Sequence, residues 1–323
     1  MAFLKTVKPA LIGLCGIFAI LAACVSGPQS ESPGTVETPP SKIIAIGDMH
    51  GDGDAYFSIL RDAGLIDKRK NWIGGDTVFV QTGDIPDRGP DSRRIIKHLQ
   101  KISAQAKTAG GRVVPLIGNH EAMVMIGDLR YVHSGEIGAF ARPGDPSGET
   151  GKKAVMDRFS RAWSPKGSIG HWVSANDAIA IIDGNIFVHG GISREYSKYS
   201  IGSMNADVRS ALRSQDTDPR SIINDPIGPL WYRGLIGFSE SAGPRNHDLS
   251  APEEVDWVLD TYNAKRIIVG HTPRLTGIKA SHDGKLIRID TGASSYYGGT
   301  RSFLRIENGD VFAHDGGKVR KLN

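Results

Sequence analysis

The sequence predicts an α/β fold in which two stacked, mixed β-sheets are flanked by helices, and three observations carry this prediction. In the first half of the chain, short apolar segments alternate with segments of helical periodicity, which is typical of a layer of strands crossed by helices. In the second half, short apolar segments are joined by Asp-Gly and Asn-Gly pairs, which favour β-hairpins. Several apolar segments also end in glycines next to Asp, Asn or His, as strands do at a ligand site.

The first half reads as strand, helix, strand, helix, strand. The predicted strands span 42–47, 77–82 and 112–117, and the predicted helices span 54–63 and 92–107. Tyr56, Phe57 and Leu60 illustrate the helical spacing, because residues three and four positions apart share one face of a helix. The third strand is predicted despite Pro115. Right-handed crossovers through the two helices then place the three strands in one layer.

The second half is predicted to consist of hairpins packed behind this layer. Their strands span 178–182 with 185–189, 278–280 with 285–290, and 302–307 with 310–314, and a further apolar strand spans 266–269. Residues 127–170 between the two halves are polar and rich in Gly and Pro, which indicates an inserted helical or loop region able to overhang a site. The sequence has no internal repeat, so residues 42–323 are interpreted as one domain.

The N-terminus has the features of a targeting segment rather than of a folded element. Lys5 and Lys8 precede an apolar stretch over 10–23, and small residues lead to Cys24, a pattern that resembles the lipobox of bacterial lipoproteins. Residues 1–23 are therefore predicted to be a lipoprotein signal peptide, with Cys24 lipidated. The alternatives are an uncleaved anchor helix and a plain signal peptide with a chance cysteine.

A lipid anchor at Cys24 predicts a protein of the bacterial cell envelope that faces the periplasm. Residues 24–41 are rich in Pro, Ser, Thr and Gly and are interpreted as a flexible tether. Val25, which is not the aspartate of inner-membrane retention, favours the outer membrane. The mature chain would keep a single, acylated cysteine and no intrachain disulfide.

The charge pattern argues against a nucleic-acid partner. The formal net charge is +4 and is dispersed along the chain, without a block of Lys and Arg interleaved with aromatic residues. We expect no nucleic acid among the partners, and a monomer.

The polar residues that follow the predicted strands form a pattern of metal ligands. They are Asp48, His50, Asp84, Asn119, His189 and His271. Glycines beside them let the backbone turn away while the side chains stay aimed at one point. Carboxylate, amide and imidazole groups together suit divalent Mn, Fe or Zn better than Ca. Six ligands exceed what one site with an open position needs, so two metals about 3.5–4 Å apart that share one carboxylate are predicted.

The motifs GDMHGD, GDIPDRG, GNHE, HGG and GHT, in this order from Gly47 to Thr272, resemble the calcineurin-like metallophosphoesterase superfamily. GDIPDRG, GNHE and HGG are similar to its phosphoprotein phosphatase branch. GPLWYRG over 228–234, together with DTG over 290–292 and YYG over 296–298, resembles the Shewanella-like phosphatases, a group linked to phosphotyrosine substrates.

The resemblance implies a role for each matching residue. Asp48 and His50 would bind the first metal, Asp84 would bridge both, and Asn119, His189 and His271 would complete the second. His120 would be the general acid, oriented by Asp87. Arg88, Asn119 and Arg233 would hold the substrate phosphate, for which the planar fork of Arg is suited.

This resemblance implies a two-metal phosphomonoesterase in which a hydroxide bridging the metals attacks phosphorus in line. Its substrate would be a phosphoprotein or phosphopeptide, with phosphotyrosine favoured. Asp52 in place of the glutamine of common eukaryotic serine/threonine enzymes weakens a serine/threonine preference. The periplasm, where intracellular kinases do not act, keeps open a small-molecule or dinucleoside-polyphosphate hydrolase. A third alternative is a metal-binding envelope protein without catalysis.

The remaining polar candidates are interpreted as structural. Surface or structural roles are predicted for His98, His133, His247, His282 and His314. A minor supporting role near the ligands is kept for His171. Asp52 and Asp54 are candidate helix caps or supports of the ligands, and Glu121 is a candidate structural anchor. Tyr296 and Tyr297 are expected either to border the substrate pocket or to pack in the core.

Overall fold

A computed structural model describes residues 40–237 and 249–322. The predicted signal peptide, Cys24, all but the last two residues of the tether, and His247 lie outside the described residues. The described residues belong to one compact unit. Among the described residues, every helix is too short or too polar to cross a membrane.

The first sheet has six strands in the order β11-β10-β9-β1-β2-β3. Its strands are β1 (Lys42–Ile46), β2 (Val78–Gln81), β3 (Arg112–Pro115), β9 (Ser302–Glu307), β10 (Asp310–Asp315) and β11 (Lys318–Leu322). The first three pair in parallel, and β9 pairs antiparallel with β1 and β10. The carboxyl ends of β1, β2 and β3 therefore lie at one edge of this sheet.

The second sheet has five strands in the order β4-β5-β6-β8-β7. Its strands are β4 (Ile179–Ile182), β5 (Asn185–Val188), β6 (Arg266–Val269), β7 (Lys279–Ser281) and β8 (Leu286–Arg288). The hairpins β4–β5 and β7–β8 are antiparallel, whereas β5, β6 and β8 pair in parallel. The predicted hairpins are present, but a parallel core joins β4–β5 to β7–β8. The placement of the third hairpin was wrong, because β9–β10 extends the first sheet beside β1 rather than packing behind it.

Alternation along β1 shows how the layers form. Ile43 and Ala45 pack into the apolar cluster between the sheets, together with Phe187 and Ile268 of the second sheet. Ile44 belongs to the other cluster, which the helices cover. Both faces of β1 are buried, which explains why its sequence is apolar throughout rather than alternating. The predicted fold class of two stacked mixed sheets between helices is confirmed.

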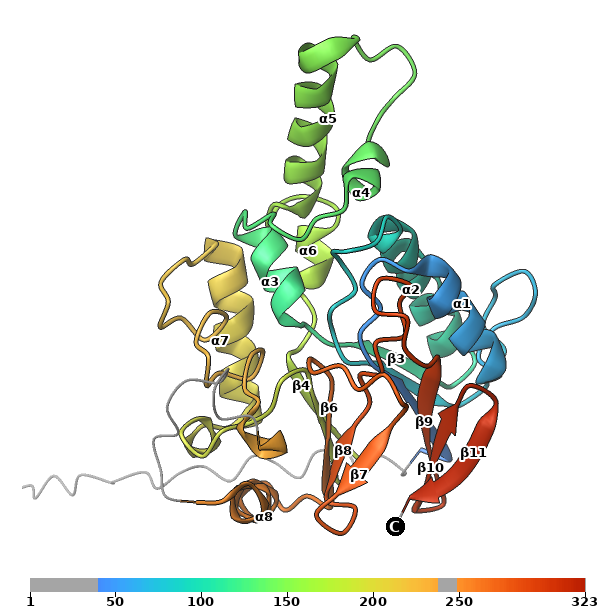
Figure 1. Cartoon of the computed structure of the whole chain (residues 1–323), viewed down its shortest axis with the longest axis vertical. Coiled ribbons are helices and arrows are strands. Elements are labelled where there is room, and N and C mark those ends of the chain that lie inside the picture. Colours follow the sequence, from blue (N-terminus) through green and yellow to red (C-terminus); the bar gives the residue numbers. More distant parts are fainter. Residues whose placement is uncertain (1–39, 238–248, 323) are drawn as a thin grey trace, which may run out of the picture. The chain divides into compact units, whose positions relative to one another are not determined.

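Helices cover the outer face of each sheet (Figure 1). They are α1 (Gly53–Asp62) and α2 (Ser92–Thr108) beside the first sheet, and α7 (Ile201–Ser214) and α8 (Ala251–Thr261) beside the second. Helix α1 begins where the Asp52 carboxylate accepts a hydrogen bond from the N–H of Ala55 at 2.8 Å. Helix α7 is tied to the edge strand β4 through Asn205, whose side-chain oxygen accepts from the N–H groups of Ala178 and Ile179.

The insertion between the two halves is helical. It contains α4 (Ser134–Gly138), α5 (Gly148–Trp163) and α6 (Gly170–Val173), and follows α3 (Asn119–Met125). Phe140 and Phe159 pack edge to face at 5.6 Å between ring centres and join α5 to the segment after α4. Figure 1 shows α5 extending beyond α3 and α6, on the side away from the strands. The sequence did not predict α3, α7, α8 or β11, nor the short 3₁₀ turns Tyr196–Lys198 and Gly234–Ile236.

Candidate active site

The predicted ligands come together at the carboxyl ends of five strands. Asp48 and His50 follow β1, Asp84 follows β2, and Asn119 begins the helix after β3. His189 follows β5 and His271 follows β6, so the second sheet contributes as well. All of these side chains are buried.

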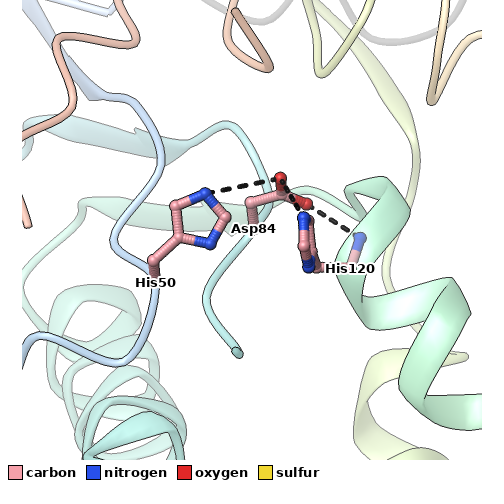
Figure 2. A group of neighbouring side chains, drawn as sticks. All are labelled: His50, Asp84 and His120. Atoms are coloured by element: carbon pink, nitrogen blue, oxygen red, sulfur yellow. Dashed lines mark hydrogen bonds and ion pairs between the residues drawn. The ribbon is translucent and has the colours of Figure 1, made fainter. Parts of the chain in front are cut away.

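Asp84 lies at the centre of the group and faces histidines on several sides. Its Oδ2 lies 3.9 Å from Nε2 of His50, 3.8 Å from Nε2 of His120 and 3.2 Å from Nε2 of His189. Figure 2 shows His50 and His120 on either side of the Asp84 carboxylate. Ligand atoms of His50, Asp84 and His120 lie within 4.8 Å of one another, as do those of Asp84, His189 and His271. The two groups share Asp84, which is the arrangement expected of a bridging carboxylate.

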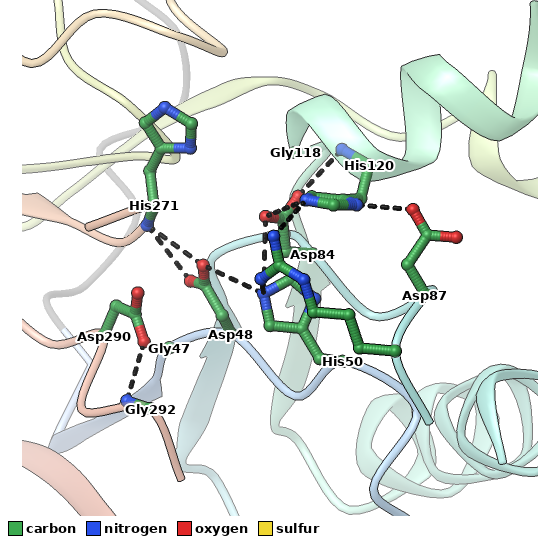
Figure 3. A network of polar contacts seen from close by, with 12 residues as sticks. Gly47, Asp48, His50, Asp84, Asp87, Gly118, His120, His271, Asp290 and Gly292 are labelled. Carbon is green, nitrogen blue, oxygen red and sulfur yellow. Dashed lines mark hydrogen bonds and ion pairs between the residues drawn. The ribbon is translucent and has the colours of Figure 1, made fainter. Parts of the chain in front are cut away.

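Asp48 lies slightly outside these two groups. Its Oδ2 is 4.0 Å from Nε2 of His50, and its carboxylate accepts a hydrogen bond from the backbone N–H of His271 at 3.1 Å. Figure 3 shows Asp48 between the His271 backbone and the cluster of His50, Asp84 and His120. Asn119 is nearer to the second group, because its side-chain oxygen lies 2.9 Å from Nε2 of His189.

The carboxylates of the site are crowded and buried. Burial raises the pKa of Asp48 well above its usual value, and the charges on Asp290 and Asp84 add to this shift. Burial also raises the pKa of Asp290 to about 6. For Asp84, burial is outweighed by His189 and His120, so its pKa lies well below the usual range. Several carboxylates at so short a range require compensation by positive charge.

These residues fit two divalent cations. Nε2 of His271 is buried and makes no hydrogen bond to any residue that the structure describes, although a buried imidazole nitrogen normally has a partner. On the opposite side, Nδ1 of His189 lies 2.8 Å from the carbonyl oxygen of Thr82, which fixes the ring with Nε2 toward the site. Imidazole, carboxylate and amide donors suit Mn, Fe or Zn.

Backbone strain is concentrated in this cluster. His50, Asp84, Asp87, Arg88 and His271 all have positive φ, between 43° and 73°, a region that non-glycine residues enter at a cost of about 1–2 kcal/mol each. The sequence interpretation assigned the turning to the glycines, which is only partly correct. Several of the glycines instead let their backbone pass close to neighbouring atoms of the site.

Gly270 is one of these close-approach glycines. A Cβ there would lie 2.6 Å from Oδ1 of Asp48 and 3.0 Å from Oγ1 of Thr82. The backbone after β6 therefore reaches the ligands only because this position lacks a side chain.

His120 is held differently from the other histidines. Its Nδ1 lies 2.5 Å from Oδ2 of Asp87, which leaves Nε2 facing the other ligands. Burial lowers its pKa, but the charges on Asp84 and Asp87 outweigh burial and the net shift is upward. An imidazole that is held by a carboxylate and stays protonated can donate a proton.

Arginine and aromatic residues line the open side of the site, a cavity of about 320 Å³. Nη1 of Arg88 lies 2.9 Å from Nε2 of His50, and the same guanidinium contacts the hydroxyl of Tyr297. Its Cζ lies 5.3, 5.5 and 4.9 Å from the ring centres of Tyr131, Tyr296 and Tyr297. Arg233 also lines the cavity and donates from Nε to Oγ1 of Thr272 at 3.1 Å.

A model of the calcineurin-like phosphoesterase family matches residues 41–275, which span every predicted ligand. The chain belongs to the calcineurin-like phosphoesterase family. It is 34% identical over 296 residues to an uncharacterized protein of Schizosaccharomyces pombe, covering 88% of this chain and 83% of that protein. It is 30% identical to Shewanella-like protein phosphatase 2 of Arabidopsis thaliana, covering 82% and 75%.

Solved structures agree with this assignment. The cold-active protein-tyrosine phosphatase of a psychrophilic Shewanella species is 27% identical, with a TM-score of 0.73 over 88% of this chain and 80% of that one. The predicted resemblance and the predicted enzyme class are confirmed: the protein is a metal-dependent phosphatase whose family uses two divalent metals. The alternative of a metal-binding protein without catalysis is not supported.

Two buried acids of this phosphoesterase support the ligand loops. The Glu121 carboxylate accepts from the N–H groups of Asp84, Ile85 and Gly118 at 2.7–2.9 Å and so joins two of the loops. Asp290 lies beside Asp48. The sequence indicates it only as the first residue of the DTG motif, without a role at the ligands. Tyr131 was missed, because it belongs to the insertion and carries no motif.

The described histidines that were predicted to be structural lie outside the cluster of ligands. His98 is buried between the hydroxyl of Tyr56 and the carbonyl oxygen of Lys70, both at 3.0 Å. His314 stacks on Phe303 at 4.1 Å between ring centres. His133, His171 and His282 are absent from both groups of candidate ligands. A groove of about 550 Å³ beside α7 shares no lining residue with the active site.

Proposed function

We propose that this phosphatase is a phosphomonoesterase that hydrolyses phosphotyrosine in peptides or proteins. The observation that carries this proposal is a cluster of tyrosines at the cavity, in which Tyr131 and Tyr297 line the cavity and Tyr296 packs against Tyr297. Tyr131, Tyr296 and Tyr297 surround the guanidinium of Arg88, and Tyr131 and Tyr296 remain exposed, at 43% and 65%. A phosphate on Arg88 would bring the phenyl ring of phosphotyrosine against these rings. The Shewanella protein of similar structure is a protein-tyrosine phosphatase, which supports the same substrate class.

In this proposal six side chains hold two metal ions, and the ions supply a water of lowered pKa and withdraw charge from the phosphate when bound. The residues that would hold them are Asp48, His50, Asp84, Asn119, His189 and His271. Of the candidate metals we favour manganese, with iron and zinc as alternatives. Metal analysis of protein purified without added metal tests this choice.

His120 would protonate the leaving oxygen from Nε2. The short contact of its Nδ1 with Asp87 fixes the orientation of the ring and favours the imidazolium. Its nearness to Asp84 would otherwise make it a third ligand of the first group. We assign it to acid catalysis because its Nδ1 partner is the carboxylate of Asp87, which favours the imidazolium, and because its Nε2 lies on the side of the cavity that Arg88 lines.

Arg88, Arg233 and Asn119 would bind the phosphate oxygens. Arg88 and Arg233 line the same cavity and come from the loop after β2 and from the turn before Gly234. Two guanidinium groups on one phosphate orient it by paired hydrogen bonds. Replacing either by Lys would keep the charge but lose the paired geometry, so KM is expected to rise.

The substrate assignment is tested by phosphate release from matched peptides. Peptides of one sequence with phosphotyrosine, phosphoserine or phosphothreonine would be compared with a nucleoside monophosphate and a dinucleoside tetraphosphate, using protein reloaded with Mn after chelation. Faster phosphate release from the phosphotyrosine peptide than from the other substrates, with loss of this release in Asp84→Asn, supports the proposal. A preference for either nucleotide would refute the phosphoprotein assignment and favour the small-molecule or dinucleoside-polyphosphate alternative.

We further propose that the chain is a monomeric lipoprotein of the bacterial envelope, anchored through Cys24 and facing the periplasm. The lipobox-like sequence before Cys24 supports this. Mass spectrometry of the N-terminal peptide, with Cys24→Ala as the control, tests it. An unmodified cysteine in a chain that retains residues 1–23 would refute it.

A further inference from the structure

The dipeptide Asp87-Arg88 is held in a conformation that it would not adopt alone. Its φ angles are 73° and 64°, in the left-handed region that costs a non-glycine residue about 1–2 kcal/mol. One of these residues orients His120 and the other lines the cavity. The surroundings must therefore fix this dipeptide for the site to keep its geometry.

The contacts that fix it come from the insertion. The N–H of Arg88 donates to the carbonyl oxygen of Tyr131 at 2.8 Å. The backbone of Asp87 lies against the side chain of Glu136, in α4. Two successive strained residues thus contact a segment that lies more than forty positions later in the sequence.

Glu136 is an unusual residue for such a place. Its side chain is fully buried, and its Oε2 also accepts a hydrogen bond from the hydroxyl of Ser92 at 2.7 Å. Oε1 of Glu136 and Oδ1 of Asp87 are both buried and make no hydrogen bond to any described residue. Burial raises the pKa of Glu136 to about 8, with the charge on Asp87 adding to the shift. Near neutral pH it therefore acts as an uncharged hydrogen-bond acceptor.

Helix α4 is itself anchored close to this point. Nη1 of Arg93, in α2, donates to the carbonyl oxygen of Ala139 at 2.5 Å, and its guanidinium lies 4.6 Å from the ring centre of Phe140. Glu136 therefore sits on a short helix that is docked at the start of α2, directly behind Asp87. A carboxyl placed there limits how far the Asp87 backbone can move away from His120.

We propose that Glu136 is a positioning residue for the Asp87–His120 pair, and that the α4 segment of the insertion is in this way part of the apparatus that protonates the leaving group. The inference rests on the proposed function, in which His120 is the acid. It predicts that loss of the Glu136 side chain damages proton donation selectively, because Asp87 can then turn its carboxylate away from Nδ1 of His120.

Leaving groups of different acidity test this selectivity. Phenyl phosphate releases a phenol of pKa about 10, which needs a proton as it leaves, whereas 2,4-dinitrophenyl phosphate releases a far stronger acid that leaves as the anion. General acids contribute about 10²–10⁴ in rate. We expect Glu136→Ala to lose about tenfold more in kcat/KM on phenyl phosphate than on the dinitrophenyl ester. Glu136→Gln, which retains the acceptor oxygen, should restore the wild-type ratio of the two substrates.

Two further variants make the outcomes distinguishable. Glu149→Ala changes an exposed glutamate of α5 that pairs only with Lys152 in the described structure, and should leave both rates unchanged. His120→Asn should show the selective loss in full; if it does not, the acid assignment fails and the proposed function with it.

If His120→Asn is selective but Glu136→Ala loses the same factor on both substrates, the inference about Glu136 alone is overturned. Should Glu136→Ala fail to fold, Glu136→Asp withdraws the carboxyl by one methylene and should show a smaller selective loss of about threefold. Equal losses on both substrates in that variant would likewise refute the positioning role.

Discussion

Replacing Glu136 by Gln should make the protein more resistant to alkaline pH. The carboxyl of Glu136 is buried, and its pKa rises from 4.5 to about 8 on folding. A raised pKa means that the folded state binds the proton more tightly, so the stability it contributes is present below pH 4.5 and is lost as pH rises toward 8. From these two values, wild type loses on the order of 2 kcal/mol between pH 6 and pH 8 through this group. Gln carries no proton to lose and keeps an acceptor oxygen for the Ser92 hydroxyl.

Urea denaturation of wild type and Glu136→Gln at pH 6, 7 and 8, at one metal concentration, measures this effect. The gap in the free energy of unfolding should widen by on the order of 2 kcal/mol across this range in favour of the variant. Other buried acids, such as Asp48 and Asp290, titrate in both proteins and cancel in the difference. Glu149→Gln should follow wild type. Parallel curves for wild type and Glu136→Gln would refute the claim that this carboxyl is protonated in the folded protein.

The metal site and the tyrosines around Arg88 can be tested separately. Gly270→Ala places a methyl group 2.6 Å from Oδ1 of Asp48, and should weaken metal binding about 10–100-fold in a calorimetric titration; an unchanged affinity would contradict the close packing. Chelation should lower Tm by several degrees, and added metal should raise it again with the logarithm of the metal concentration, because ions that neutralise the buried carboxylates bind the folded state; a melting temperature insensitive to metal would argue against this. Tyr297→Phe removes the hydroxyl that contacts Arg88, and should raise KM a few-fold with little change in kcat, whereas a fall in kcat alone would show that the contact acts in the chemical step.

The strained loop after β2, which orients His120, links catalysis to stability. Asp87, Arg88 and Asp84 all hold left-handed backbone conformations. The N–H groups of Asp84 and Arg88 donate to Glu121 and Tyr131, and Glu136 lies against the backbone of Asp87. The cost of the strained loop is offset by acceptors in α3 and in the insertion. Mutations in these acceptors should therefore change activity without touching the substrate.

The sequence by itself determined the two-layer class and the set of candidate ligands. Apolar segments such as 43–46 mark strands that are buried on both faces, and each ends in a glycine-framed polar residue, because parallel strands deliver their ends to one edge. These are local signals, readable within ten residues. The hairpins at Asp183-Gly184 and Asn308-Gly309 were predicted for the same reason, since their turns require residues that tolerate positive φ.

Only the tertiary structure decided how distant parts support the site. Nothing near Glu136 in the sequence indicates that it reaches Asp87, forty-nine positions earlier. Nor does the sequence show that Tyr131 joins Tyr296 and Tyr297 around Arg88. The helices α7 and α8 were not predicted although local signals mark their starts: the Ser200 hydroxyl accepts from the N–H of Ser203, and Ser250 with Glu253 has the spacing of a capping box. Contacts between residues far apart in the chain depend on how whole layers pack, and the residue pattern within one segment does not indicate them.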